Sequence, residues 1–168
     1  MYMEGFMAFI WDESFMTGFT DIDDQHYHLV GLINAFGDFV TSEEKSEEVI
    51  KIVFNELYEY TSYHFKEEET LMELEGIDPY FLELHIKIHK EFLSKVKEMH
   101  EKVSIDEPTT LQHLYEFLVH WLTHHILGID KNTTAQITAI KNGCDAEDAF
   151  LLVRKEVNKN LKHYQLAI

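Results

Sequence analysis

Histidine and carboxylate residues recur in this chain at spacings that suit metal binding. His64 and Glu68 are four residues apart, and so are His85 and His89, so each pair would lie one turn apart on one face of a helix. Imidazole nitrogens and carboxylate oxygens are ligands for transition-metal ions, and their number predicts a site for two ions rather than one. The full candidate set is His26, His64, Glu68, His85, His89, His125 and Asp130.

The segments that carry these residues have the pattern of amphipathic helices. The chain holds only two prolines and seven glycines, and its apolar residues recur every three or four positions. The candidate ligands fall within the apolar stripes, where a histidine or carboxylate without a partner would cost free energy on burial. Metal binding would supply that partner. The pattern therefore predicts an all-α protein.

Prolines and glycines mark where several of the expected helices begin and end. Pro79 and Pro108 suit the first turn of the third and fourth helices, and Gly76 suits the end of the second. Four such helices with short connections pack as an up-down-up-down bundle, and an added C-terminal helix follows a break at Asn142 and Gly143. The expected bounds are about 21–41, 44–75, 79–103, from 108 onward past Asp130, and about 146–166.

The ligand of the fourth helix is a choice between two adjacent histidines. His125 continues the apolar stripe of Leu118 and Trp121, whereas His124 aligns with His120, so His125 is the predicted ligand. The other histidines are interpreted as a half-exposed lateral stripe.

Asp130 follows His125 by five residues, a spacing that an ideal helix would rotate about 140° apart. For both to reach one metal centre, the helix must widen locally. The spacing therefore predicts a π-type turn near Gly128.

Charge and cysteine content exclude several classes of partner and cofactor. A formal net charge of −17 argues against nucleic acid and anionic membranes, because both would repel the chain. The single cysteine, Cys144, rules out an internal disulfide and a zinc–thiolate or iron–sulfur site, and we assign it no role. We find neither a signal peptide nor an apolar run of about 18 residues. The expected location is therefore the cytoplasm.

Four segments of the chain resemble the hemerythrin family, in its bacterial form. They are Asp23-Asp24-Gln25-His26, His64-Phe65-Lys66-Glu67-Glu68-Glu69-Thr70-Leu71-Met72, His85-x-x-x-His89-x-x-Phe92 and Trp121-Leu122-x-x-His125-Ile126-x-x-x-Asp130. Trp11, Ser14 and Gly18 fit the same pattern upstream. The resemblance covers roughly residues 9–130 and fills every ligand position.

This resemblance implies an oxo- or hydroxo-bridged pair of iron ions. One iron would be held by His85, His89 and His125, the other by His26 and His64, with Glu68 and Asp130 bridging them. With about six positions on each iron, one position stays open on the iron with two histidines, where dioxygen would bind. Apolar residues within a turn of the ligands would line the dioxygen pocket, namely Phe65, Trp121, Leu122 and Ile126.

The chain divides by expectation into a di-iron bundle, residues 1–130, and a helical extension, residues 131–168, that can act as a signalling linker. The segment 130–150 resembles the extension that follows hemerythrin domains fused to GGDEF diguanylate cyclases. This favours a sensor of oxygen or redox state that acts through a downstream signalling domain, or through a homodimer formed by the last helix.

Two other functions remain open from sequence alone. A stand-alone oxygen carrier or store would need no downstream partner. A di-iron peroxidase or oxygen reductase would need an acid–base residue aimed at the open position, and the sequence identifies none, so the domain itself is not expected to be an enzyme.

Overall fold

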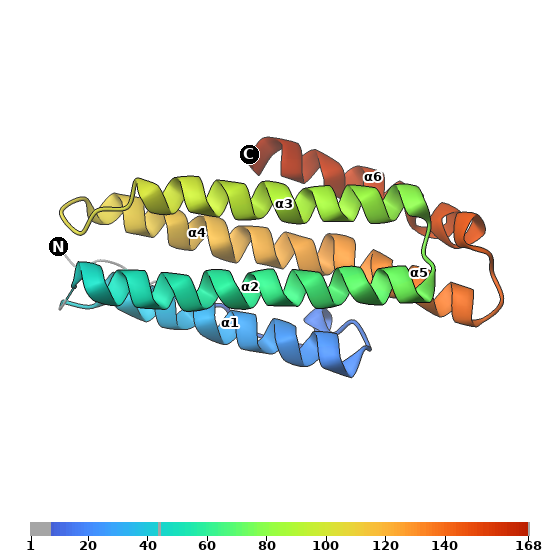
Figure 1. Ribbon diagram of the computed structural model, residues 1–168, viewed down its shortest axis with the longest axis horizontal. Helices are drawn as coiled ribbons and strands as arrows, with labels where there is room; N and C mark the ends of the chain where they lie inside the picture. The colour runs from blue at the N-terminus through green and yellow to red at the C-terminus, as the bar shows by residue number, and fades with distance from the viewer. Residues whose placement is uncertain (1–7, 44, 168) are drawn as a thin grey trace.

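The computed structural model of the protein describes residues 8–43 and 45–167, with side chains to residue 162. This part of the chain forms a bundle of four long helices that run alternately up and down (Figure 1). They are α1 (Thr20–Thr41), α2 (Glu47–Glu75), α3 (Pro79–Glu101) and α4 (Pro108–His125). The predicted all-α bundle is confirmed.

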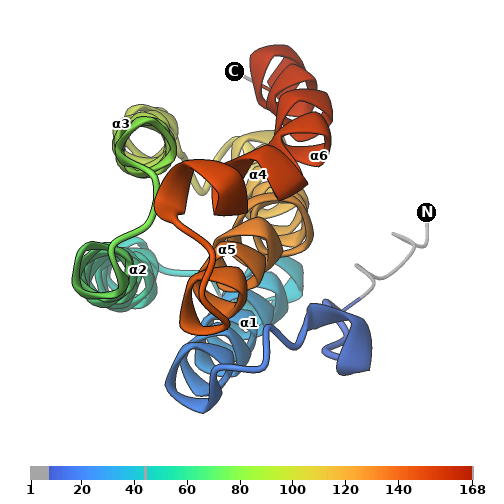
Figure 2. The same cartoon turned by 90° about the vertical axis from the view of Figure 1, so that its right-hand side faces the viewer.

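The helices surround one apolar core. Viewed along the bundle, α1 packs against α2 and α4, and α3 packs against the same two helices (Figure 2). Side chains at most 2% exposed fill the centre, among them Leu29, Phe36, Phe81, Leu111, Leu114 and Leu118. No helix in the described ranges is both long and apolar enough to cross a membrane.

The predicted widening of the fourth helix is present. A π-helical turn, η2 (Ile126–Asp130), joins α4 to α5 (Lys131–Lys141), and the Lys131 N–H donates to the Ile126 carbonyl five residues back. After Asn142 and Gly143, α6 (Ala146–Ala167) folds back beside the bundle and packs against α4, α5 and the π turn (Figures 1 and 2). The expected break and added helix are therefore also confirmed.

Caps explain where two of the helices start. The Ser46 side chain accepts from the Val49 N–H at 3.1 Å, so α2 starts at Glu47, whereas the expected start at Glu44 lies outside the described residues. The Asp78 carboxylate accepts from the Phe81 N–H at 3.0 Å and fixes the start of α3 beside Pro79.

The second helix ends at a glycine, as expected, whereas the third helix does not. Gly76 ends α2 with φ 66°, a left-handed conformation that favours glycine. The third helix ends at Glu101, slightly before the expected position near 103. There Lys102 caps the helix with αR backbone, and its N–H donates to the carbonyls of His100 and Met99.

Two glycines within α1 test how closely the helices pack. A Cβ on Gly37 would lie 2.6 Å from the ring of buried Tyr115 in α4, whereas a Cβ on Gly31 would meet nothing within 4 Å. We expect Gly37→Ala to lower the free energy of unfolding by about 1–3 kcal/mol, because α1 and α4 must separate. The matched change Gly31→Ala should raise it by about 0.5–1 kcal/mol through helix propensity.

Urea unfolding of the metal-free protein would measure both values. Equal stability of the two variants would contradict the close approach of α1 to Tyr115.

Candidate metal centre

The bundle brings all of the predicted ligands into one interior region. His26 comes from α1, His64 and Glu68 from α2, His85 and His89 from α3, His125 from the end of α4, and Asp130 from the end of the π turn. Each of these side chains is at most 1% exposed. Neither solvent nor a surface ion pair therefore stabilises the group, and its members must be partnered inside the fold.

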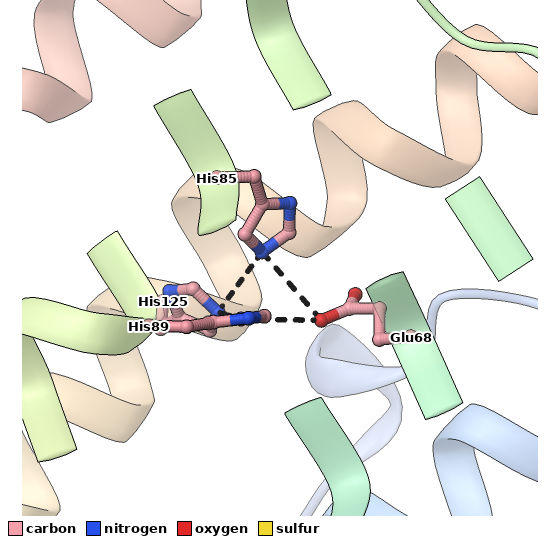
Figure 3. Close-up of side chains that lie close together, drawn as sticks. All are labelled: Glu68, His85, His89 and His125. Atoms are coloured by element: carbon pink, nitrogen blue, oxygen red, sulfur yellow. Dashed lines mark hydrogen bonds and ion pairs between the residues drawn. The ribbon is translucent and has the colours of Figure 1, made fainter. Parts of the chain in front are cut away.

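Four of these residues form the first subset of the site. His85, His89, His125 and Glu68 point toward one another, and their ligand atoms all lie within 4.8 Å (Figure 3). The Nε2 atom of His125 is 3.2 Å from His85 Nε2 and 3.0 Å from His89 Nε2. Atoms bound about 2.1 Å from one metal ion at right angles are about 3 Å apart, so this donor set fits a single ion.

Asp130 faces two groups of histidines at once. Its Oδ1 lies 3.1 Å from His125 Nε2 and 3.3 Å from His85 Nε2, while Oδ2 lies 3.2 Å from His26 Nε2. The two oxygens of one carboxylate are therefore directed to opposite sides. That is the arrangement needed by a carboxylate shared between two metal ions.

The second subset is smaller, and some of its nitrogens have no hydrogen-bond partner among the described residues. The rings of His26 and His64 have centroids 4.7 Å apart. Within the described residues, neither His26 Nδ1 nor His64 Nε2 has a hydrogen-bond partner, and His26 Nε2 faces Asp130 Oδ2. Buried polar nitrogens of this kind are rare in folded proteins. Their presence beside Asp130 Oδ2 fits a second metal ion.

Burial keeps two of the imidazoles neutral. Burial lowers the pKa of His64 to about 3, with the neighbouring His26 adding to the effect. Burial likewise lowers the pKa of His125 to about 4, although Asp130 opposes the shift. Only a neutral imidazole can donate a lone pair to a metal ion, so these histidines are ready ligands at neutral pH.

The two carboxylates and His89 shift one another's pKa values. Burial opposes ionisation of Glu68 and Asp130, but nearby histidines outweigh it and hold the pKa of each carboxyl below its usual value. Burial also opposes protonation of His89, but hydrogen bonds with Glu68 and Glu69 outweigh it and raise the pKa of His89. Ionised carboxylates can bridge cations, whereas protonated ones cannot.

Three polar residues that the sequence analysis missed contact the outer nitrogens of the histidines. Such contacts fix ring orientation and tautomer, leaving Nε2 directed inward. Glu69 and Gln25 adjoin predicted ligands in sequence, which could have served as a signal. The Nδ1 contacts are Gln25 Oε1 with His64 at 2.8 Å, Glu69 Oε1 with His89 at 3.1 Å and Thr133 Oγ1 with His85 at 3.2 Å.

The four residues predicted to line a dioxygen pocket are all buried near these ligands. Phe65 stacks on His89 with ring centroids 3.7 Å apart, and Trp121 stacks on His125 at 4.2 Å. Leu122 and Ile126 are 4% and 0% exposed. The two aromatic rings thus lie chiefly against the three-histidine subset, although Phe65 is also 5.7 Å from the His64 ring.

On the side of the two-histidine subset lies Trp11, which the sequence analysis named in the family pattern without placing it beside a ligand. The half-buried ring of Trp11 lies 6.3 Å from His26, between centroids. His124, the rejected alternative, is only half-buried, and its ring lies 4.1 Å from exposed His120. The choice of His125 as the inward residue therefore agrees with the structure.

Comparisons with known proteins agree with this geometry. The family described as Hemerythrin HHE cation binding domain matches residues 17–136. A bacteriohemerythrin of Pseudomonas paraeruginosa is 36% identical over 72% of this chain and 76% of its own length. One of Clostridium acetobutylicum is 30% identical over 73% of this chain and 96% of its own length, and the myohemerythrin of Riftia pachyptila is 27% identical over 73% and 88%.

No solved structure gives a significant match to the chain. The family match nevertheless covers most of the bundle and every one of the predicted ligands. The chain therefore belongs to the hemerythrin family, whose domain binds a di-iron centre and dioxygen.

Proposed function

We propose that the seven buried residues hold the iron pair in the arrangement that the resemblance implies. His85, His89 and His125 would hold one iron, His26 and His64 would hold the other, and Glu68 and Asp130 would be shared between the two. The observation that carries this proposal is Asp130, whose two oxygens face different groups of histidines at 3.1–3.3 Å. When bound, the iron pair would supply dioxygen binding and electron exchange.

The protein's own residues prepare this site in two ways. Burial keeps the imidazoles of His64 and His125 neutral, so that one nitrogen of each ring can bind a metal ion, and neutral ligands add less negative charge than carboxylates do, which favours ferrous iron. Phe65, Trp121, Leu122 and Ile126 surround the ligands with buried apolar side chains, the two aromatic rings chiefly on the three-histidine side, and exclude water from the centre. Proposed roles of this kind favour binding over catalysis, and we assign the domain no catalytic residue.

For the biological role, we propose a sensor of oxygen or redox state. Residues 1–130 form the di-iron unit, and residues 131–168 form an extension that transmits a change to a downstream signalling domain or a second copy of the chain. Support comes from α6, which packs against the π turn that links two proposed ligands. With one cysteine in the chain, we place this function in the reducing cytoplasm.

An absorption time course would separate sensing from carriage or storage. Iron-loaded protein is reduced without oxygen, exposed to dioxygen, and then deoxygenated. We expect a visible band that forms with dioxygen and passes rapidly to the spectrum of a stable diferric protein, as redox sensing requires. A long-lived band that reverses on deoxygenation would favour a carrier or store. Failure to bind two irons, or no oxygen-dependent band, would contradict the proposal of a dioxygen site.

Two adjacent histidines provide a matched test of the ligand assignment. His125→Ala should weaken iron binding at least about tenfold, because it removes a donor from the centre. His124→Ala, one residue earlier, should leave iron content and the absorption bands unchanged. Iron analysis after dialysis against a weak chelator measures the difference. Equal iron retention in both variants would remove His125 from the ligand set.

Acid should weaken the metal-free fold in a definite pH window. Between about pH 4 and pH 6.5, His64 and His125 bind fewer protons in the folded than in the unfolded protein, so the free energy of unfolding falls as pH falls. The lowered pKa values of Glu68 and Asp130 act in the same direction, since their stabilisation is lost on protonation.

His89 acts oppositely, because its raised pKa stabilises the fold below its unfolded pKa and this contribution is lost as pH rises through the folded value. Urea midpoints measured from pH 7 to pH 4 would therefore decrease toward acid. Constant or rising midpoints across that range would contradict the neutral state of the two histidines.

A further inference from the structure

Among the described residues, the C-terminal helix makes a polar contact with the π turn that joins two of the proposed ligands. The Asn160 side-chain amide in α6 donates to the Gly128 carbonyl at 2.8 Å, in the middle of the π turn between His125 and Asp130. The Asn132 amide donates to the same carbonyl. One carbonyl at the centre of the turn thus receives donors from two different helices, α5 and α6.

Asn160 occupies a position where an apolar residue would be expected. It follows buried Phe150 and Val157 at helical spacing, on the face of α6 that packs on the bundle. Apolar packing at those two residues already attaches α6. A half-buried amide on the same face, aimed at a single carbonyl, therefore has a more specific role than attachment.

Gly128 is shaped to accept this contact. A Cβ at Gly128 would lie 3.0 Å from Asn160 Cγ and 3.1 Å from its Nδ2, so a larger residue would require the amide to shift by a few tenths of an ångström. A π turn holds one extra residue in the helix, and it needs outside support because regular α-helical bonding competes with it. Return to regular geometry would rotate Asp130 away from His125.

We propose that Asn160 is a positioning residue for the iron ligands. By binding the Gly128 carbonyl it keeps the π turn open, holds His125 and Asp130 on one side, and couples α6 to the state of the metal centre. This inference rests on the proposed ligand assignment and specifies the route by which the extension would sense the irons. Coupling is reciprocal, so a change at the centre also changes the packing of α6.

An isosteric substitution tests the positioning role. Asn160→Asp keeps the shape but replaces the amide donor with a carboxylate that repels the carbonyl. Asn158→Asp makes the same charge change at an exposed position of the same helix. In the iron-loaded, oxidised protein we expect shifted absorption bands and about tenfold faster iron removal by a chelator for Asn160→Asp, with wild-type values for Asn158→Asp.

A folded Asn160→Asp variant with wild-type bands and wild-type iron release would overturn the inference. If that variant does not fold, Asn160→Ala removes the donor without adding charge, and Gly128→Ala displaces it while leaving Asn160 intact. Both changes should shift the absorption bands. A variant that combines Asn160→Ala with Gly128→Ala should show a band shift and an iron-release rate no larger than those of Asn160→Ala alone. Additive effects in the double variant would contradict action through one contact.

Hydrogen exchange tests the coupling separately from the spectra. Amide exchange in residues 146–162 should differ between the reduced and oxidised iron-loaded forms of the wild type, and the difference should disappear in Asn160→Asp. No difference in the wild type, or a difference retained in the variant, would overturn the coupling. If the wild type fails to load two irons, the proposed ligand assignment is contradicted instead. Iron analysis of the wild type before the exchange experiment distinguishes this outcome from a failure of the coupling.

Discussion

Seven ionisable side chains share the dry interior of this bundle, and the rest of the structure depends on how that burial is offset. A buried polar atom without a hydrogen bond costs about 1–3 kcal/mol, and His26 Nδ1 and His64 Nε2 are such atoms among the described residues. Metal ions would satisfy these donors together, so metal binding and folding are thermodynamically linked. The apolar layers away from the centre must hold the fold while the ligands lack their ions.

Local spacing explains how much of the site was predictable from sequence. His64 and Glu68, like His85 and His89, are placed by one helical turn, and helix geometry is the same wherever a helix forms. The π turn was also predictable from sequence, because a spacing of five positions from His125 to Asp130 does not place both residues on one face of a regular α-helix. The four-helix bundle followed from the same periodicity and from prolines at helix starts.

Tertiary contacts explain what sequence analysis missed. Gln25 and Thr133 touch histidines that are 39 and 48 residues away in the chain, and no local pattern encodes such distances. The position of α6 has the same origin. Its periodicity predicts a helix with one packed face, but not that this face would meet the π turn. The Trp11 ring beside His26 likewise depends on how the segment before α1 folds back.

The π turn depends on both local spacing and tertiary contacts. Local sequence requires it, since both His125 and Asp130 must face inward, yet it departs from the regular bonding that stabilises the neighbouring α-helix. Support therefore has to come from elsewhere in the fold, and Gly128 leaves room for that support because it carries no side chain. The donors that reach its carbonyl come from α5 and α6, which follow the proposed ligands in the chain. A bundle that ended at Asp130 would lack both donors, so the contacts that this carbonyl receives from side chains depend on the helices that follow the proposed ligands.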